Sequence, residues 1–160
     1  MKPTPSIPVQ RLNHAVLYVS DLERAASFYE RVFGFTRIAQ HGPMAFLRAQ
    51  GSDNHHDLGL LSLGARAKPA PSGSTGLYHL AWQVGTIQEL AAAREILLRE
   101  GALSGESDHG ATKSLYGADP DGNEFEIMIL LPREEWGQFE HEAPVQRLNW
   151  DTELKRKPRV

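Results

Sequence analysis

Two histidines and one glutamate are placed in the sequence so that they could bind a single metal ion. His14 and His79 each lie in a short apolar segment, NHAVLYV and YHLAWQV. Glu126 interrupts the apolar run FEIMILL, and a carboxylate in such a run is costly unless it is paired or coordinated. Two imidazoles and one carboxylate form the facial ligand set of non-haem Fe(II) sites, which leaves coordination positions open for substrate and oxygen. The three residues therefore predict a mononuclear metal centre.

An internal repeat relates the two histidines. Shifting the first half of the chain by 65 residues places His14 on His79, and near the end of the repeat a shift of 69 residues places Asp57 on Glu126. Self-similarity of this kind indicates duplicated units, and units packed about a pseudo-two-fold axis bring equivalent positions together. Either histidine alone could be a hydrogen-bonded core residue. The repeat-related pair beside a buried glutamate favours a metal site.

Each copy of the repeat has the pattern of one strand, one helix and three further strands. In the first copy, Ser20 and Glu23 have the spacing of a capping box, an apolar stripe follows, and Gly34 is placed to end the helix. Thr86 and Glu89 repeat the capping box in the second copy. The expected strands are residues 11–19, 35–40, 44–49 and 57–63 in the first copy and 76–84, 102–107, 112–118 and 124–131 in the second, with helices at 22–33 and 88–99.

The chain has 160 residues, of which 41% are apolar, with no cysteine and a net charge of −3. These values are typical of a globular protein, exclude disulfides and thiolate metal ligands, and give no reason to expect nucleic acid as a partner. No apolar segment is long enough to span a membrane, and residues 1–10 lack the apolar core of a signal peptide. We therefore expect a cytoplasmic protein without a membrane or nucleic-acid partner.

Three stretches give the chain a family resemblance: LNHAVLYVSDLERAASFYERVFGF, LYHLAWQV and YGADPDGNEFEI. Through them the chain resembles the vicinal oxygen chelate superfamily, which includes glyoxalase I, fosfomycin-resistance proteins and extradiol dioxygenases. The resemblance covers residues 11–131. It implies an α+β fold in which two paired βαβββ modules form a curved mixed sheet around a metal site. The expected organisation is one domain at residues 1–131, with module one at 10–63, a linker at 64–76 and module two at 77–131, followed by a C-terminal extension at 132–160.

The remaining candidate residues resemble the extradiol branch of this superfamily. His56 lies in a stretch similar to that of an acid–base histidine in these enzymes, and His109 lies near a second histidine position. Tyr116 lies ten residues before Glu126, as a substrate-contacting tyrosine does. The resemblance implies that the two histidines and the glutamate described above hold Fe(II). It also implies that His56 is the acid–base group for oxygen, and that Tyr116 and His109 orient an aromatic diol substrate that reacts with O₂.

Two other functions remain open from the sequence. Glyoxalase-like members carry a fourth ligand, a glutamate, in the last strand of the first module, and either Asp57 or Gly59 holds that place here. With Asp57 there, the alternative is a glyoxalase-like or epimerase-like enzyme that transfers a proton with Ni, Zn or Co and uses no oxygen. As the bound metal, Mn(II), Ni(II) or Zn(II) are the alternatives to Fe(II). With Gly59 there, a three-ligand dioxygenase is favoured. A small-molecule-binding resistance protein without a metal would not need the histidines and the glutamate.

Residues 132–160 break the repeat and carry large apolar residues among charges, including Trp136, Phe139, Leu148 and Trp150. Their spacing fits neither a helix face nor a strand, so we expect them to pack on the domain or on a partner subunit. The paired modules also leave outer strand edges that need cover. We therefore expect a homodimer, with the extension either in its interface or over the substrate entrance.

Overall fold

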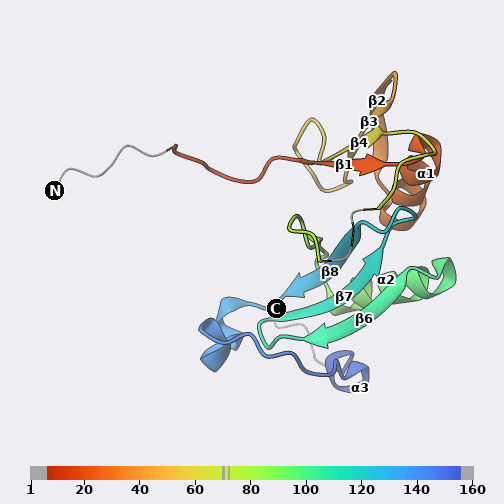
Figure 1. Cartoon of the computed structure of the whole chain (residues 1–160). Coiled ribbons are helices and arrows are strands. Elements are labelled where there is room, and N and C mark those ends of the chain that lie inside the picture. The colour runs from red at the N-terminus through yellow and green to blue at the C-terminus, as the bar shows by residue number, and fades with distance from the viewer. Residues whose placement is uncertain (1–6, 70, 72, 156–160) are drawn as a thin grey trace.

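The computed structural model describes residues 7–69, 71 and 73–155. The ends of the expected domain and extension, residues 1–6 and 156–160, and residues 70 and 72 of the expected linker lie outside the described residues. Two successive βαβββ units are followed by a C-terminal extension (Figure 1). The expected α+β architecture of paired βαβββ modules is thereby confirmed.

Each unit forms a four-stranded mixed sheet that packs against one helix. The strand order is β1-β4-β3-β2 in the first sheet and β5-β8-β7-β6 in the second. The first and last strands of each unit pair in parallel, and the other neighbours are antiparallel. The bounds are β1 Ala15–Val19, α1 Leu22–Phe33, β2 Thr36–His41, β3 Met44–Arg48, β4 Leu58–Ser62, β5 Leu80–Gln83, α2 Ile87–Glu100, β6 Leu103–Asp108, β7 Thr112–Ala118 and β8 Glu124–Leu130.

The two helices begin differently, although the sequence predicts the same capping box for both. Thr86 and Glu89 form the predicted box at the start of α2. The prediction for α1 is wrong, because Asp21 and not Ser20 caps this helix. The Ser20 hydroxyl is engaged elsewhere: it donates a hydrogen bond to Oδ1 of Asp121, at 2.5 Å, in the turn before β8. The capping position therefore moves one residue along the chain.

One face of each sheet is buried under its helix. In β8, Phe125, Ile127 and Ile129 are buried, and the residues between them are less so. α1 connects the two units, because the rings of Phe28 and Phe33 lie 6.1 and 5.0 Å from the ring of Phe125, measured between centroids. Since apolar burial is the dominant favourable term in folding, this shared cluster holds the two units together.

The opposite face of each sheet is open. On β1, Val16 and Tyr18 point to this open face and are 49% and 65% exposed, whereas Leu17 and Val19 point to the core. On β8 the open face carries Glu126, which alternates with the buried residues of that strand. The residues with potential chemistry therefore lie on the faces that the chain's own helices leave uncovered.

The C-terminal extension packs on the second unit of its own chain. Leu148 is buried there, and the indole N–H of Trp150 donates to Oε2 of Glu106 in β6 at 2.7 Å. The indole N–H of Trp136 donates to the carbonyl of Leu131 at 2.7 Å. Of the expected places for the extension, its own domain is the one observed, and it covers the edge strand of the second sheet. Its elements are η1 Arg133–Glu135, η2 Gly137–Glu140 and α3 Trp150–Glu153.

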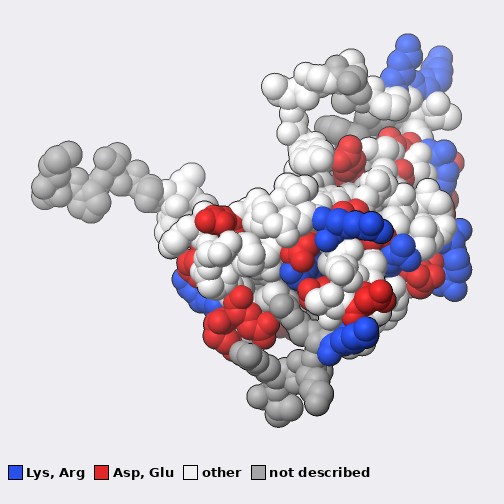
Figure 2. Space-filling model, turned by 90° about the horizontal axis from the view of Figure 1, so that it is seen from below, with Lys and Arg blue, Asp and Glu red and all other residues white. Residues whose placement is uncertain are grey.

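Acidic and basic side chains are interspersed on the face seen in Figure 2, with uncharged residues between them. This mixed surface accords with the small net charge of −3. Among the helices of the described residues, none has the length and apolar character needed to cross a membrane.

Candidate metal site

The second sheet brings four of the predicted residues together on its open face. Glu126 stands opposite Tyr116 in the antiparallel pair of β7 and β8. His79 immediately precedes β5, which pairs with β8 on the other side. Its Nε2 lies 3.0 Å from Oε2 of Glu126. His109, in the turn after β6, completes the group through Tyr116. One histidine nitrogen and one carboxylate oxygen thus converge beside a phenol and a second imidazole.

Tyr116 lies between an imidazole and a carboxylate that compete for its one hydroxyl proton, and the imidazole is the nearer of the two. Its hydroxyl lies 2.7 Å from Nε2 of His109 and 3.4 Å from Oε1 of Glu126. Burial, with the neighbouring Glu126 carboxylate as the next cause, raises the pKa of Tyr116 above its usual value. The hydroxyl therefore carries its proton at neutral pH and is available as a hydrogen-bond donor.

The first sheet holds the other two predicted residues. His14 immediately precedes β1, and its Nδ1 lies 2.9 Å from Oδ1 of Asn13. An amide oxygen only accepts, so Nδ1 is the protonated nitrogen and Nε2 keeps its lone pair. The ring of His56 lies 4.4 Å from that of His14, measured between centroids. Burial, followed by the nearby His14 and His55, lowers the pKa of His56.

Asp57 binds protein groups rather than facing the open sheet. Its carboxylate accepts hydrogen bonds from the hydroxyl of Ser52 at 2.6 Å, the backbone N–H of Ala49 at 2.9 Å and the side-chain amide of Asn54 at 2.8 Å. Burial alone acts to raise the pKa of Asp57, but these three hydrogen bonds outweigh it, and the pKa lies below its usual value. Asp57 therefore fixes the loop that carries His56.

Strand register shows which residue of the first unit corresponds to Glu126. In the second sheet Ala81, two residues after His79, pairs with Glu126. In the first sheet Val16, two residues after His14, pairs with Gly59. The structural equivalent of Glu126 is therefore Gly59, and the 69-residue shift that aligns Asp57 with Glu126 does not describe the fold. The first unit places no carboxylate at the position of a fourth ligand.

The two halves of the predicted ligand set lie apart in one chain. Within residues 7–69, 71 and 73–155, no three histidine, aspartate or glutamate side chains are grouped closely enough to hold a metal ion. The second sheet supplies two candidate ligands, His79 and Glu126, and the first supplies His14. The three-residue set itself stays a prediction. The sequence pattern identified all of these residues, but it gave no sign of Asn13 as the partner of His14.

The donor chemistry of both halves fits a metal ion. Histidine ligands typically donate their second ring N–H to an acceptor, which orients the ring and frees the other nitrogen. His14 shows this arrangement with Asn13. His79 does not show it, because its buried Nδ1 has no hydrogen-bond partner among the described residues, but its Nε2 faces Oε2 of Glu126 at 3.0 Å.

The chain is similar to known proteins in sequence and in fold. The sequence matches the family described as the glyoxalase/bleomycin resistance protein/dioxygenase superfamily over residues 11–127. It is 35% identical over 126 residues to a catechol-2,3-dioxygenase of Bacillus subtilis (strain 168), which is 78% of this chain and 43% of that protein. It is 28% identical over 124 residues to the metallothiol transferase FosB of Lysinibacillus sphaericus (strain C3-41), which is 74% of this chain and 82% of that protein.

A solved structure with the same fold is the fosfomycin resistance protein FosX from Listeria monocytogenes, in complex with Mn(II) and sulfate. The TM-score is 0.59 at 19% identity, and the match covers 79% of this chain and 97% of that one. The present chain spans less than half the length of the catechol dioxygenase that it matches, and most of the length of the two fosfomycin-related proteins.

Proposed function

Because this chain belongs to the glyoxalase/bleomycin resistance protein/dioxygenase superfamily, we propose that it is a non-haem Fe(II)-dependent, extradiol-type dioxygenase that cleaves the ring of a catechol-like aromatic diol. The observation that carries the proposal is the place of Gly59. A glycine opposite Val16 leaves the candidate site with two histidines and one carboxylate, and such a site keeps positions open for a bidentate diol and for O₂. A catechol-2,3-dioxygenase among the relatives supports the same reaction.

The proposed ligand set takes His79 and Glu126 from one copy of the chain and His14 from a second copy. Two observations support this arrangement. The described residues of one chain do not bring three such ligands together. The open faces that carry the two halves also expose large apolar side chains, Tyr18 on the strand that follows His14 and Tyr78 next to His79 in the chain. A homodimer that faces the first sheet of one copy with the second sheet of the other would cover these residues and complete the site.

The metal is proposed as Fe(II), with Mn(II), Ni(II) or Zn(II) as alternatives. Imidazole and carboxylate ligands suit all of these ions, and a family member of the same fold binds Mn(II). A bound Fe(II) would supply a Lewis acid for the diol and a path for electrons from the diol to O₂. Since both atoms of O₂ enter the ring-opened product, the reaction needs no external reductant.

The chain's own residues hold the substrate and move protons. Tyr116 lies beside Glu126, where its hydroxyl can bind a diol oxygen next to the metal ligands. His109, in contact with Tyr116, takes part in the same hydrogen-bonded group. His56 lies against His14, on the other half of the site, where an imidazole can give a proton to reduced oxygen.

Anaerobic reconstitution with Fe(II), followed by oxygen uptake with a panel of catechols, tests the proposed function. The expected result is one O₂ consumed for each diol cleaved, with no uptake in the metal-free protein. The alternative is a glyoxalase-like or epimerase-like proton transfer, and a FosB relative of similar length keeps a transferase among the other candidates. Metal binding without oxygen uptake for any diol of the panel would contradict the dioxygenase proposal and favour those alternatives.

A further inference from the structure

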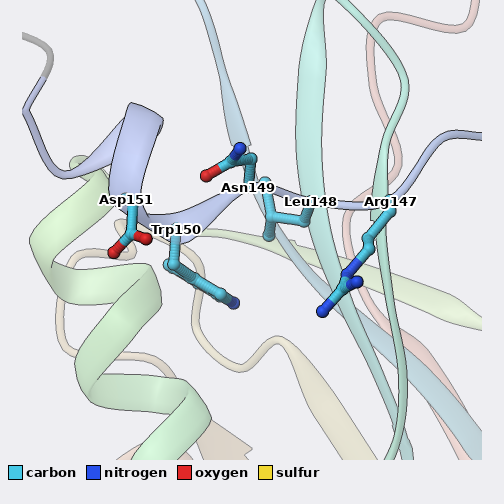
Figure 3. A pocket seen from close by; sticks show the side chains of 5 residues that line it. All are labelled: Arg147, Leu148, Asn149, Trp150 and Asp151. Atoms are coloured by element: carbon cyan, nitrogen blue, oxygen red, sulfur yellow. The ribbon is translucent and has the colours of Figure 1, made fainter.

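The C-terminal extension runs along the edge of the second sheet next to the candidate site. Asp108, the last residue of β6, and Gln146 exchange both backbone hydrogen bonds, at 2.9 and 3.0 Å. Farther along, Trp150 lies beside α2, and the guanidinium of Arg94 is 5.8 Å from the centroid of its ring (Figure 3). The segment shown in Figure 3 thus connects the sheet edge with the helix.

Close packing fixes the extension at the turn that carries His109. The ring of Phe139 lies on Gly110, where a Cβ atom would come within 2.3 Å of the ring. Lys113 is 4% exposed, and its ammonium donates to Oδ1 of Asp108 at 2.5 Å and to the carbonyl of Gly110 at 3.2 Å. A buried ammonium needs such partners, so these bonds hold the turn in one conformation, on which Phe139 of the extension packs.

The contact between His109 and the extension determines where the imidazole carries its proton. Nδ1 of His109 lies 2.7 Å from the carbonyl oxygen of Pro144. A carbonyl oxygen only accepts, so Nδ1 must be the donor. In the neutral ring Nε2 is then the acceptor, and the hydroxyl of Tyr116, 2.7 Å away, must donate to it.

We propose that the extension is part of the active site. The carbonyl of Pro144 holds His109 in the Nδ1–H tautomer, and Nε2 of His109 can then accept the proton of the Tyr116 hydroxyl. Pro144 is a positioning residue in this arrangement. It lies outside residues 11–127, the part of the chain that matches the superfamily.

The consequence for the reaction rests on the proposed function. When a diol oxygen is bound at Tyr116, its proton passes to the Tyr116 oxygen while the Tyr116 proton passes to Nε2 of His109. One O–H bond breaks and one forms at the tyrosine, and the imidazole becomes a cation whose Nδ1–H still donates to Pro144. The carbonyl dipole stabilises that cation. With the opposite tautomer, Nε2 would carry a proton and could not accept a second one.

The tautomer is measured directly by nitrogen-detected NMR correlation of the full-length, metal-free protein labelled with ¹⁵N-histidine. The His109 signals are identified by their loss in His109→Gln. The expected result is a proton on Nδ1 and a lone pair on Nε2, with a change in the Nε2 shift alone when Tyr116→Phe removes its donor. A proton on Nε2 of neutral His109 would overturn the proposal, whatever reaction the protein catalyses.

A pair of variants at one position tests the role of the extension. Gln146→Pro removes the backbone N–H that bonds to Asp108, whereas Gln146→Ala keeps it and changes only an exposed side chain. In Gln146→Pro the Nε2–H tautomer of His109 should become populated, and kcat should fall by about tenfold or more with the metal content unchanged. Gln146→Ala should match the wild type in both. Equal tautomers and equal kcat in the two variants would overturn the proposal.

The two proposals can fail separately. If the proposed function is wrong, no diol consumes oxygen, but the tautomer of His109 in the metal-free chain is unaffected. If the extension has no role, diols are cleaved, but His109 either carries its proton on Nε2 or keeps the Nδ1–H tautomer in Gln146→Pro. If Gln146→Pro fails to fold, the NMR measurement on the wild-type chain still tests the tautomer of His109. Phe139→Ala, which loosens the packing on Gly110, then replaces Gln146→Pro in the comparison of variants.

Discussion

Gly59 stands opposite Val16 in the first sheet as Glu126 stands opposite Ala81 in the second. The two units are therefore equivalent in backbone but not in ligands, because the first offers a histidine and no carboxylate. The proposed metal site, built from both units, would have three protein ligands, and this number distinguishes a centre with open positions from a four-ligand centre. The first group of expected outcomes follows from that difference.

Placing a carboxylate at position 59 should convert the site. Gly59→Glu would complete a four-ligand set, and since a Cβ at this position lies 3.1 Å from Cγ2 of Val16, the substitution is made together with Val16→Ala. Metal binding should be retained or tightened, while oxygen uptake falls by about 100-fold as open positions are lost. Gly59→Gln in the same Val16→Ala background introduces a side chain of equal size without charge, and its oxygen uptake should fall less than that of Gly59→Glu. Equal activity of the two variants would place position 59 away from the metal.

Removing the partner of His14 should weaken the metal without removing a ligand. Asn13 Oδ1 accepts from Nδ1 of His14, and the loss of such an outer partner typically costs about 10–100-fold in metal affinity. We expect this loss in Asn13→Ala and not in Asn13→Asp, which keeps an acceptor. Competition with a chelator of known affinity measures it. An unchanged metal Kd in Asn13→Ala would show that the Asn13 contact does not orient a ligand.

Two adjacent histidines allow a matched test of the acid–base assignment. His56 lies against the ring of His14, whereas His55 is the exposed neighbour. His56→Phe should leave the metal bound and lower turnover by about 10²–10⁴, the usual contribution of a proton-transferring side chain. His55→Phe removes only the neighbour whose Nδ1 lies 3.1 Å from Nδ1 of His56, so it should lower turnover far less than His56→Phe. Loss of metal from His56→Phe would instead identify His56 as a ligand, and full turnover would identify it as a bystander.

Asp57 should contribute to stability with a defined dependence on pH. Its pKa is lower in the folded chain than in the unfolded chain, so its stabilising contribution is present above the unfolded pKa of about 4 and is lost as the pH falls through the folded pKa. Asp57→Asn should cost about 1–3 kcal/mol in unfolding free energy at pH 7 because the donors around it lose their charged acceptor.

Urea unfolding between neutral and acid pH measures this contribution. The acid-side loss of stability should be smaller in Asp57→Asn than in the wild type. Asp53→Asn, at an exposed carboxylate of the same loop, is the control and should change neither quantity. Loss of the metal from Asp57→Asn, with the fold intact, would revive Asp57 as a ligand.

Much of the fold could be predicted because local patterns and tertiary structure agree. The turn before β8, the capping box of α2 and all eight strands follow from turn chemistry and from the alternation of apolar residues. The predicted cap at Ser20 is wrong because the Ser20 hydroxyl bonds to Asp121, about a hundred residues away, and a local pattern does not indicate such a contact. Strand register determines that Gly59, and not Asp57, is the equivalent of Glu126. The sequence repeat cannot decide between the two residues, because loops of different length change the shift that aligns the last strands.

Other features of the site lie beyond what side-chain patterns can indicate. The three predicted ligands stay a prediction, because whether one chain assembles them depends on how the two sheets pack, and the repeat alone does not determine that. The contact of Pro144 with His109 is made by a backbone carbonyl, which every residue has. The position of this carbonyl depends on the path of the extension. The aromatic residues of the extension indicate that it packs on a protein surface, but they do not identify that surface.

Mixing two inactive variants tests the central claim, a metal site shared between two copies of the chain, most directly. His14→Ala and Glu126→Gln each remove one ligand from every site, so neither should bind Fe(II) stoichiometrically alone. In a mixed dimer, the His14→Ala copy supplies His79 and Glu126, and the Glu126→Gln copy supplies His14. Random exchange should therefore restore about a quarter of the wild-type metal content and oxygen uptake. A mixture of dimers that binds no more metal than the separate variants would contradict the shared site.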